Sequence, residues 1–205
     1  MKKCGDSLIS EQDLFQSQSG GVIPTSPLQF KLYPCRFGAI SNIFKKYHYK
    51  GNHIGGGITY NLKLQYRDRI LGGAVVGKPR HDSKYKKCLE IRRMACINEA
   101  PKNTESYFLS KIIWFIKKHN KDIDFVLSYA DLSVGHKGTI YAASNFKCKG
   151  ETSPTKHIYW NGVRYHPRSL TVERPYSYKL REAIKNGKAK MTTELPKTIW
   201  IYDLH

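Results

Sequence analysis

The residues best suited to chemistry gather in one stretch of the chain, residues 124–144. An apolar run at 125–129 is typical of a buried strand, and a polar loop with two glycines and then a short helical segment follow it. Asp131, His136 and Tyr141 lie in or next to this loop. Ligands of α/β proteins bind beyond the carboxyl ends of strands, so a carboxylate, an imidazole and a phenol placed there could move protons. The alternative is that Asp131 only begins a turn and Tyr141 only packs in the core.

The elements that must position this stretch follow from the spacing of the apolar residues. Strict alternation at 58–66 predicts a strand with one apolar face. The alternation of a later strand slips at Arg92 and Arg93, which indicates a β-bulge, and Thr104 is expected to cap the helix that comes next. The expected strands cover 28–33, 58–66, 70–76, 88–97, 125–129, 145–149 and a hairpin at 156–167, and the expected helices cover 34–46, 104–119, 139–144 and 175–187.

The order of these elements predicts the fold class α/β (α+β), with a mixed central sheet flanked by helices and a basic helical C-terminal tail. Three consecutive strands are expected to pair antiparallel, and the strand-helix-strand unit before residue 130 requires a parallel crossover. This order resembles the superfamily of acyl-CoA-dependent N-acyltransferases, the GNAT fold. The expected organisation is a loosely ordered extension at 1–26, a GNAT-like catalytic domain at 27–170, and a basic helix and tail packed on it at 171–205.

The charge of the chain points to a polyanionic partner. Lys and Arg number 35 against 16 Asp and Glu, a formal net charge of +19. Nucleic acid is the first candidate and a membrane surface the second. No apolar run approaches a membrane span, and no signal peptide follows Met1, so we expect a cytoplasmic protein without an obligate protein partner. The five widely spaced cysteines indicate neither a zinc site nor a disulfide framework.

Three motifs resemble one particular family. They are Tyr-His-Tyr at 47–49, the segments 89–93 and 100–106, and the pattern from Ser-Tyr-Ala-Asp to Ala-Ala-Ser-Asn at 128–145. These motifs are similar to those of the phage Mom proteins, which convert adenine N6 in DNA to a methylcarbamoyl form and so protect phage DNA from restriction in the bacterial host. The active-site residues implied by this resemblance are His48, Tyr49, Asp131 and Tyr141.

The chemistry of these residues is compatible with that activity. An exocyclic adenine amine is a poor nucleophile and needs a base, which Asp131 or His48 could provide. A leaving thiolate needs a proton, which Tyr141 or Tyr49 could donate. The family resemblance also implies a possible iron requirement. His48 and Asp131 would be the only obvious ligands, so no metal-site residues are predicted.

The donor loop departs from the superfamily pattern. A glycine-rich run usually precedes the central helix, whereas residues 100–105 contain no glycine. Backbone N–H groups at the helix start could still bind an anion, with Lys102 adding charge and Glu105 opposing it. An acyl-CoA donor such as acetyl-CoA is therefore suggested by the fold alone. The candidate donor-binding residues are Arg93, Lys102, Asn103, Thr104 and Ser106.

Double-stranded DNA is the expected partner. Adenine N6 takes part in base pairing, so the base would have to be flipped out of the duplex. Residues 179–190 form one further basic stretch. Two alternatives remain: a GNAT-fold N-acyltransferase acting on a protein or small-molecule amine, and a non-catalytic basic DNA-binding protein. The candidate DNA-binding residues are Lys45, Lys46, Arg80, Lys84, Lys86, Lys87 and Lys137.

Overall fold

The computed structural model describes residues 25–52, 54–79 and 85–205, and within them the chain forms two compact units. The first unit comprises the residues up to Ser128 together with 139–148 and 200–205, and the second comprises 129–138 and 149–199. These units follow contacts in space, so they group the chain differently from the division expected at residues 26 and 170, which stays a prediction. Most of the expected N-terminal extension lies outside the described residues.

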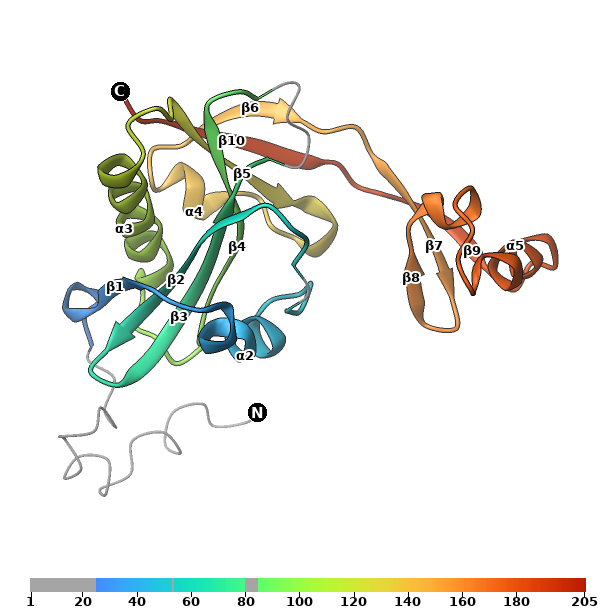
Figure 1. The fold of residues 1–205 in the computed structure, drawn as a ribbon, viewed down its shortest axis with the longest axis horizontal. Coiled ribbons are helices and arrows are strands. Elements are labelled where there is room, and N and C mark those ends of the chain that lie inside the picture. Colours follow the sequence, from blue (N-terminus) through green and yellow to red (C-terminus); the bar gives the residue numbers. More distant parts are fainter. Residues whose placement is uncertain (1–24, 53, 80–84) are drawn as a thin grey trace, which may run out of the picture. The chain divides into compact units, whose positions relative to one another are not determined.

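A mixed seven-stranded sheet dominates the structure, in the order β1-β2-β3-β4-β5-β10-β6 (Figure 1). Strands β1 to β4 pair antiparallel, whereas β4 and β5 pair parallel across an intervening helix, as the element order predicted. This arrangement confirms the predicted fold class. The strands are β1 (Lys31–Pro34), β2 (Ile58–Tyr66), β3 (Arg69–Gly77), β4 (Cys88–Cys96), β5 (Phe125–Asp131), β6 (Lys147–Glu151) and β10 (Lys197–Asp203).

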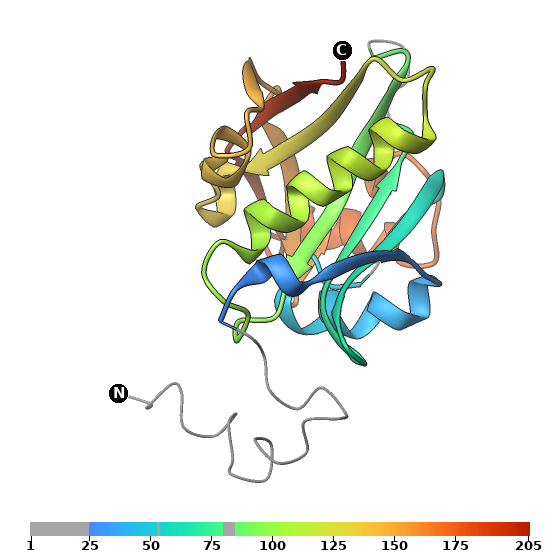
Figure 2. The same cartoon turned by 90° about the vertical axis from the view of Figure 1, so that its left-hand side faces the viewer.

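Two helices of the first unit, α2 and α3, cover opposite faces of its sheet (Figure 2). Two consecutive glycines of β3 allow the two helices to pack close to this strand. A side chain at Gly72 would meet Phe108 of α3, whereas one at Gly73 would meet Ile40 and Phe44 of α2. Ile40 and Phe44, one helical turn apart, are fully buried, and burial of each stabilises the fold by about 1.5–3 kcal/mol. The helices are α2 (Phe37–Tyr47), α3 (Thr104–His119), α4 (Thr139–Ala142) and α5 (Ser177–Lys185), with 3-10 turns η2 (Pro27–Gln29), η3 (Leu132–Val134) and η4 (Pro167–Leu170).

The predicted β-bulge in β4 is present. Val75 of β3 pairs with Arg93 and Val76 pairs with Ile91, so Arg92 is the extra residue. Its guanidinium donates hydrogen bonds to the carbonyl oxygens of Gly56 and Lys78, which ties the loop before β2 to the end of β3.

The parallel pairing of β4 with β5 runs from Cys88 opposite Phe125 to Glu90 opposite Leu127. At the next position along β5, Ser128 instead approaches Ile91 through its side chain, with Oγ 3.4 Å from the carbonyl oxygen. This side-chain contact lies directly after the last paired position of the two strands, where the bulge of β4 begins.

A second sheet, in the order β8-β7-β9, lies within the second unit. Its strands are β7 (Thr155–Trp160), β8 (Val163–Tyr165) and β9 (Lys190–Glu194). Asn161 and Gly162 join β7 to β8 with φ values of 49° and 72°, which confirms the predicted two-residue hairpin turn.

The expected helical tail is only partly correct. Helix α5 forms, but β9 follows it, and β10 then enters the large sheet between β5 and β6. The sequence could not reveal this because β9 is a polar strand and because the neighbours of β10 are distant in the chain. No helix of the described residues has both the length and the apolar composition needed to cross a membrane.

Three smaller expectations also change. The N-cap of α3 is Asn103, in the left-handed region at φ 68°, whereas Thr104 is the first helical residue and donates its hydroxyl to the Pro101 carbonyl (2.7 Å). Strand β5 continues through Ala130 to Asp131 instead of ending before them. The first strand is shorter than expected, because η2 occupies the residues before Phe30.

Candidate active site

A pocket of about 540 Å³ lies in the first unit where β4 leads into α3. Its wall is formed by the end of β4, the loop that follows, the first turn of α3, and α4 with the residue after it. Arg93 does not line it. The other four predicted donor-binding residues do: Lys102, Asn103, Thr104 and Ser106.

The electrostatics of this pocket are mixed. The first turn of α3 presents backbone N–H groups that an α-helix leaves without intrahelical acceptors, including those of Glu105 and Ser106, and these favour an anion. The carboxylate of Glu105 in the same wall opposes it. Burial, followed by the charge of Glu105, raises the pKa of Cys96 to about 12. Cys96 is thus a protonated thiol in the pocket wall and is unsuited to act as a nucleophile.

Tyr141 lies on α4, the same short helix that contributes Thr139 and Ile140 to the pocket wall. Its hydroxyl accepts a hydrogen bond from Ser128 Oγ at 2.7 Å, and its ring packs against those of Phe146 and Trp200, with centroids 5.4 and 5.9 Å away. Burial is the main cause that raises the pKa of Tyr141, and the hydrogen bond from Ser128 only partly offsets it. Tyr141 therefore holds its proton at neutral pH and can donate it.

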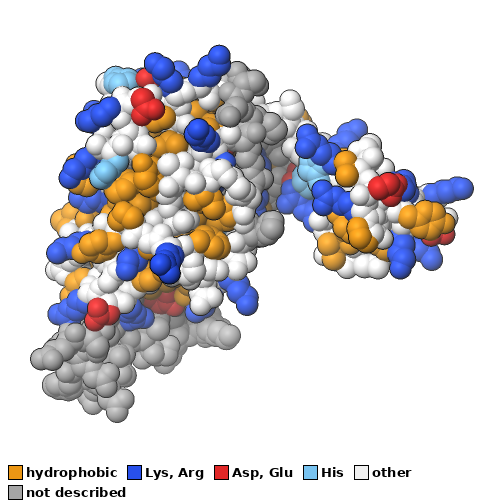
Figure 3. Space-filling view, viewed as in Figure 1, with side chains coloured by type: hydrophobic (Ala, Val, Ile, Leu, Met, Phe, Trp, Pro, Cys, Tyr) orange, Lys and Arg blue, Asp and Glu red, His pale blue; other side chains and the backbone are white. Residues whose placement is uncertain are grey.

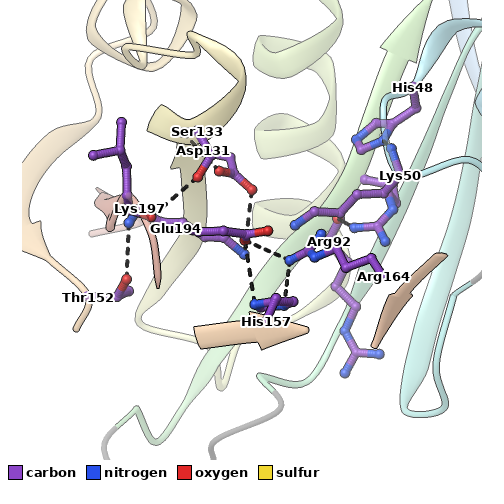
Figure 4. Close-up of polar contacts among 12 residues, drawn as sticks. His48, Lys50, Arg92, Asp131, Ser133, Thr152, His157, Arg164, Glu194 and Lys197 are labelled. Carbon is purple, nitrogen blue, oxygen red and sulfur yellow. Dashed lines mark hydrogen bonds and ion pairs between the residues drawn. The ribbon is translucent and has the colours of Figure 1, made fainter. Parts of the chain in front are cut away.

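His48 and Tyr49 follow the last residue of α2. Their rings stack with centroids 4.7 Å apart, and the Lys50 ammonium lies 5.0 Å from the centroid of Tyr49. The backbone N–H of Lys50 donates to His48 Nδ1 at 3.1 Å. In the neutral imidazole this acceptor role leaves the proton on Nε2, so His48 presents a hydrogen-bond donor rather than a basic nitrogen. Figure 4 shows His48 beside Lys50.

Asp131 belongs to the second unit and is 4% exposed. Its Oδ1 accepts the N–H of Ser133 (3.2 Å), and its Oδ2 lies 3.7 Å from Lys197 Nζ (Figure 4). The Asp131 carbonyl accepts the N–H of His136, an exposed loop residue, and Ser133 Oγ donates to the Leu195 carbonyl at 3.4 Å. The carboxylate is thus held at the start of the loop. Asp131 does begin a turn, as one of the two interpretations of the sequence proposed.

A polar cluster on the second sheet was not expected from the sequence. Glu194 of β9 accepts hydrogen bonds from Arg164 (2.7 Å) and Tyr159 (3.0 Å), and lies 3.8 Å from His157 Nδ1 (Figure 4). Arg164 Nη2 is 2.5 Å from His157 Nε2. Burial lowers the pKa of His157, and the nearby charge of Arg164 lowers it further. The Asn161-Gly162 turn, which places Tyr159 opposite Arg164, was the part of this cluster that the sequence could indicate.

The predicted DNA-binding residues are spread over several elements of the described chain. Lys45 and Lys46 are exposed in the last turn of α2, Lys86 and Lys87 are exposed just before β4, and Lys137 is exposed between η3 and α4. Arg80 and Lys84 lie outside the described residues. Binding by this set stays a prediction.

The residues present do not fit the iron suggested by the resemblance. Among residues 25–52, 54–79 and 85–205, no group of three His, Cys, Asp or Glu side chains could hold a metal ion. His48 and Asp131, the two ligands considered, belong to different compact units.

The fold is that of the GNAT acetyltransferases. The chain superimposes on a Bacillus subtilis acetyltransferase in complex with CoA (TM-score 0.53, 13% identity, 86% of this chain and 99% of that one). It also superimposes on an Elizabethkingia anophelis GNAT-family acetyltransferase with acetyl-CoA bound (0.53, 12%, 86% and 99%) and on the Escherichia coli ribosomal-protein-S18-alanine N-acetyltransferase (0.51, 10%, 85% and 94%). At these identities the similarity concerns the fold alone.

The chain belongs to the Mom protein family, whose sequence model matches residues 29–202. This match confirms the resemblance drawn from the motifs and extends it well beyond them, through the second sheet and into β10. No curated protein sequence matches the chain significantly.

Proposed function

We propose that this Mom-family protein is a transferase that attaches a methylcarbamoyl-type acyl group to the N6 amine of adenine in DNA and thereby protects phage DNA from host restriction. The observation that carries the proposal is the pocket beside α4, because a cavity at the end of β4 and a protonated phenol occur together in the first unit. Membership of the Mom family and the net charge of +19 support the choice of acceptor.

An acyl-CoA thioester fits this pocket in its main features. To give the proposed product, the acyl group of this donor would have to be the methylcarbamoyl-type group itself, because acetyl-CoA would leave an acetyl group on N6. Lys102, the amide side chain of Asn103 and the N–H groups at the start of α3 would hold an anionic part of the donor. Glu105 weakens that fit, so donors with less charge at this point are favoured. When bound, the donor supplies an activated carbonyl carbon and a leaving sulfur.

The proton transfers fall to residues of this chain. As the adenine nitrogen bonds to the carbonyl carbon and the carbon–sulfur bond breaks, a base must take a proton from the amine and an acid must protonate the sulfur. Tyr141 is the candidate acid, because its phenol is protonated and it lies on α4, which contributes to the pocket wall. Asp131 is the better base candidate, since the hydrogen bond from Lys50 leaves His48 with a donor at Nε2.

The acceptor is adenine flipped out of double-stranded DNA in the cytoplasm of a phage-infected or prophage-carrying bacterial cell. Duplex pairing hides N6, so an extruded base is the form that can react. The exposed Lys45, Lys46, Lys86, Lys87 and Lys137 are available for phosphate contacts.

The test is to express the protein with a plasmid, digest the plasmid DNA to nucleosides, and analyse them by mass spectrometry. We expect an adenosine adduct in the wild type, a decrease of about 100-fold in Asp131→Asn, and no change in Asp203→Asn. Asp203 is a matched control because it also pairs with a lysine, Lys147 at 3.0 Å, but is exposed.

Unmodified DNA from cells that contain abundant folded protein would contradict the proposal. If the purified protein then acylated a protein or small-molecule amine, the N-acyltransferase alternative would be favoured. Retained DNA binding without any adduct or amine acylation would instead favour the non-catalytic DNA-binding alternative.

A further inference from the structure

Between β6 and β10, residues 152–196 build a small structure of their own inside the second unit: the sheet β8-β7-β9, η4 and helix α5. We call these residues the inserted module. Its core is small, with Ile158 and Leu180 fully buried and Ala183 nearly so. Ser177 is also buried and donates its hydroxyl to the Val172 carbonyl at 3.0 Å, which anchors the start of α5.

The inserted module carries a large unneutralised positive charge. It contains nine Lys and Arg residues and three Glu residues. Glu173 pairs with Arg181, and Glu194 pairs with Arg164. Figure 3 shows Lys and Arg side chains over the exposed surface of this part. Among the described residues, seven exposed cations of the module have no carboxylate partner: Lys156, Arg168, Arg174, Lys179, Lys185, Lys188 and Lys190.

Three of these cations stand on a well-ordered turn at the C-terminal end of α5. Gly187 adopts a left-handed φ of 68°, and the N–H of Lys188 returns to the Ala183 carbonyl at 2.8 Å. This turn carries Lys185 and Lys188, and Lys190 begins β9 directly after it. The backbone that presents these ammonium groups is therefore organised before any partner binds.

An exposed aromatic ring lies beside this cationic turn. Tyr159 of β7 pairs with Arg164 on one side and with Lys190 on the other, so the three side chains share one face of the sheet. Tyr159 is 39% exposed, and its hydroxyl is held by Glu194. A positioned ring between two cations can pack against a sugar or base while its neighbours contact phosphates.

An anionic membrane is a weaker fit to the same charge. Membrane-surface helices use an apolar face to enter the lipid. The apolar side of α5, formed by Leu180 and Ala183, is already buried inside the module. Helix α5 has only nine residues and no free apolar face with which to enter lipid. Its charge is therefore better suited to a polyanion bound at the surface, such as duplex DNA.

We propose that the inserted module binds the phosphate backbone of duplex DNA through Lys185, Lys188 and Lys190, with Tyr159 packed against the strand beside them. The choice of DNA rests on the proposed function. The module itself is then the part of the protein that holds the substrate duplex, separate from the pocket for the group donor.

The test measures binding of the full-length protein to a fluorescent duplex of about 30 base pairs over about 50–300 mM salt. Each phosphate contact contributes roughly 0.9 to the slope of log affinity against log salt, so Lys185→Gln/Lys188→Gln/Lys190→Gln should lower that slope by up to ~2.7. The matched control is Lys117→Gln/Lys118→Gln/Lys121→Gln. It removes the same charge from exposed lysines at the end of α3 and should change the slope much less.

An unchanged slope in the first variant, or an equal decrease in both, would overturn the proposal. The proposal would also be overturned if the wild type bound phosphatidylserine vesicles more tightly than duplex DNA and the triple variant at Lys185, Lys188 and Lys190 lost that vesicle binding. The nucleoside assay separates the two proposals. If the module variant lowers the salt slope but the wild type makes no adenosine adduct, only the proposed function is contradicted. If the wild type makes the adduct and the module variant binds DNA unchanged, only the module proposal is contradicted.

Discussion

The two compact units of this protein are stabilised in different ways. The first unit packs apolar side chains on both faces of a sheet, and its buried residues include Leu62, Leu71 and Ile112, all fully buried. The second unit buries few large apolar side chains and relies on polar pairs, such as Asp131 with Lys197 and Glu194 with Arg164. Close packing makes the first unit sensitive to volume, whereas the polar pairs make the second sensitive to charge and pH.

The same difference separates the two residues proposed for proton transfer. Tyr141 in the first unit lies among aromatic rings with a serine hydroxyl as partner, and burial raises its pKa. Asp131 in the second unit is held by a backbone amide and a lysine. An apolar setting keeps a phenol protonated. The residues proposed as acid and base therefore lie in different surroundings.

The largest expected effect tests the acid role. Tyr141→Phe should lower adenosine adduct formation about 100- to 1,000-fold while changing the free energy of unfolding by only about 1 kcal/mol. Adduct yield and chemical denaturation measure the two quantities. Tyr60→Phe is the matched control, because the Tyr60 hydroxyl also takes part in one hydrogen bond, to Asn120 (3.1 Å), but Tyr60 belongs to β2, which contributes no residue to the pocket wall, whereas α4 does. Equal activity of the two variants would remove Tyr141 from the mechanism.

A smaller effect tests the close packing of the first unit. A Cβ at Gly77 would collide with the Gly57 carbonyl and crowd Arg92, so Gly77→Ala should lower the free energy of unfolding by about 1–3 kcal/mol. Gly38→Ala, in α2 with open space around it, should instead be neutral or raise it by up to about 1 kcal/mol. Urea denaturation distinguishes them. Destabilisation by Gly38→Ala equal to that by Gly77→Ala would show that crowding is not the cause.

The smallest expected effect concerns the pH response of the second unit. Because the pKa of folded His157 is lowered, the unfolded chain takes up a proton first as the pH falls below about 6.5, so acidification lowers stability. Arg164 and Glu194 face His157 from β8 and β9, and the ring of His166 lies 6.0 Å away. The decrease in Tm between about pH 7.5 and 5.5 should be about 1–3 °C smaller in His157→Gln than in the wild type.

His119→Gln serves as the control for that measurement, since His119 is an exposed histidine at the end of α3. The pH dependence of its Tm is measured beside that of His157→Gln. A wild-type slope retained in His157→Gln would show that another group sets the acid response.

Much of the fold could be predicted from local patterns. Residues 58–66 alternate strictly and form β2 over that same range, and the slip at Arg92 marks the bulge. The Asn161-Gly162 pair specifies its turn because both positions require positive φ. Strand β9 was missed because its side chains are mostly polar, and Asn103 was missed as the N-cap because the adjacent Thr104 is also a typical cap residue.

The amino-acid sequence by itself determined the fold class, the family and the identity of Tyr141 and Asp131 as residues of interest, since each depends on local periodicity or on a short motif. The tertiary structure was needed for their surroundings. The partners of Asp131 and Glu194 include Lys197 and Arg164, which come from separate strands, and the pocket wall combines α3 with α4. Burial, pKa and charge pairing depend on distances between residues far apart in the chain, and only folding brings those residues together.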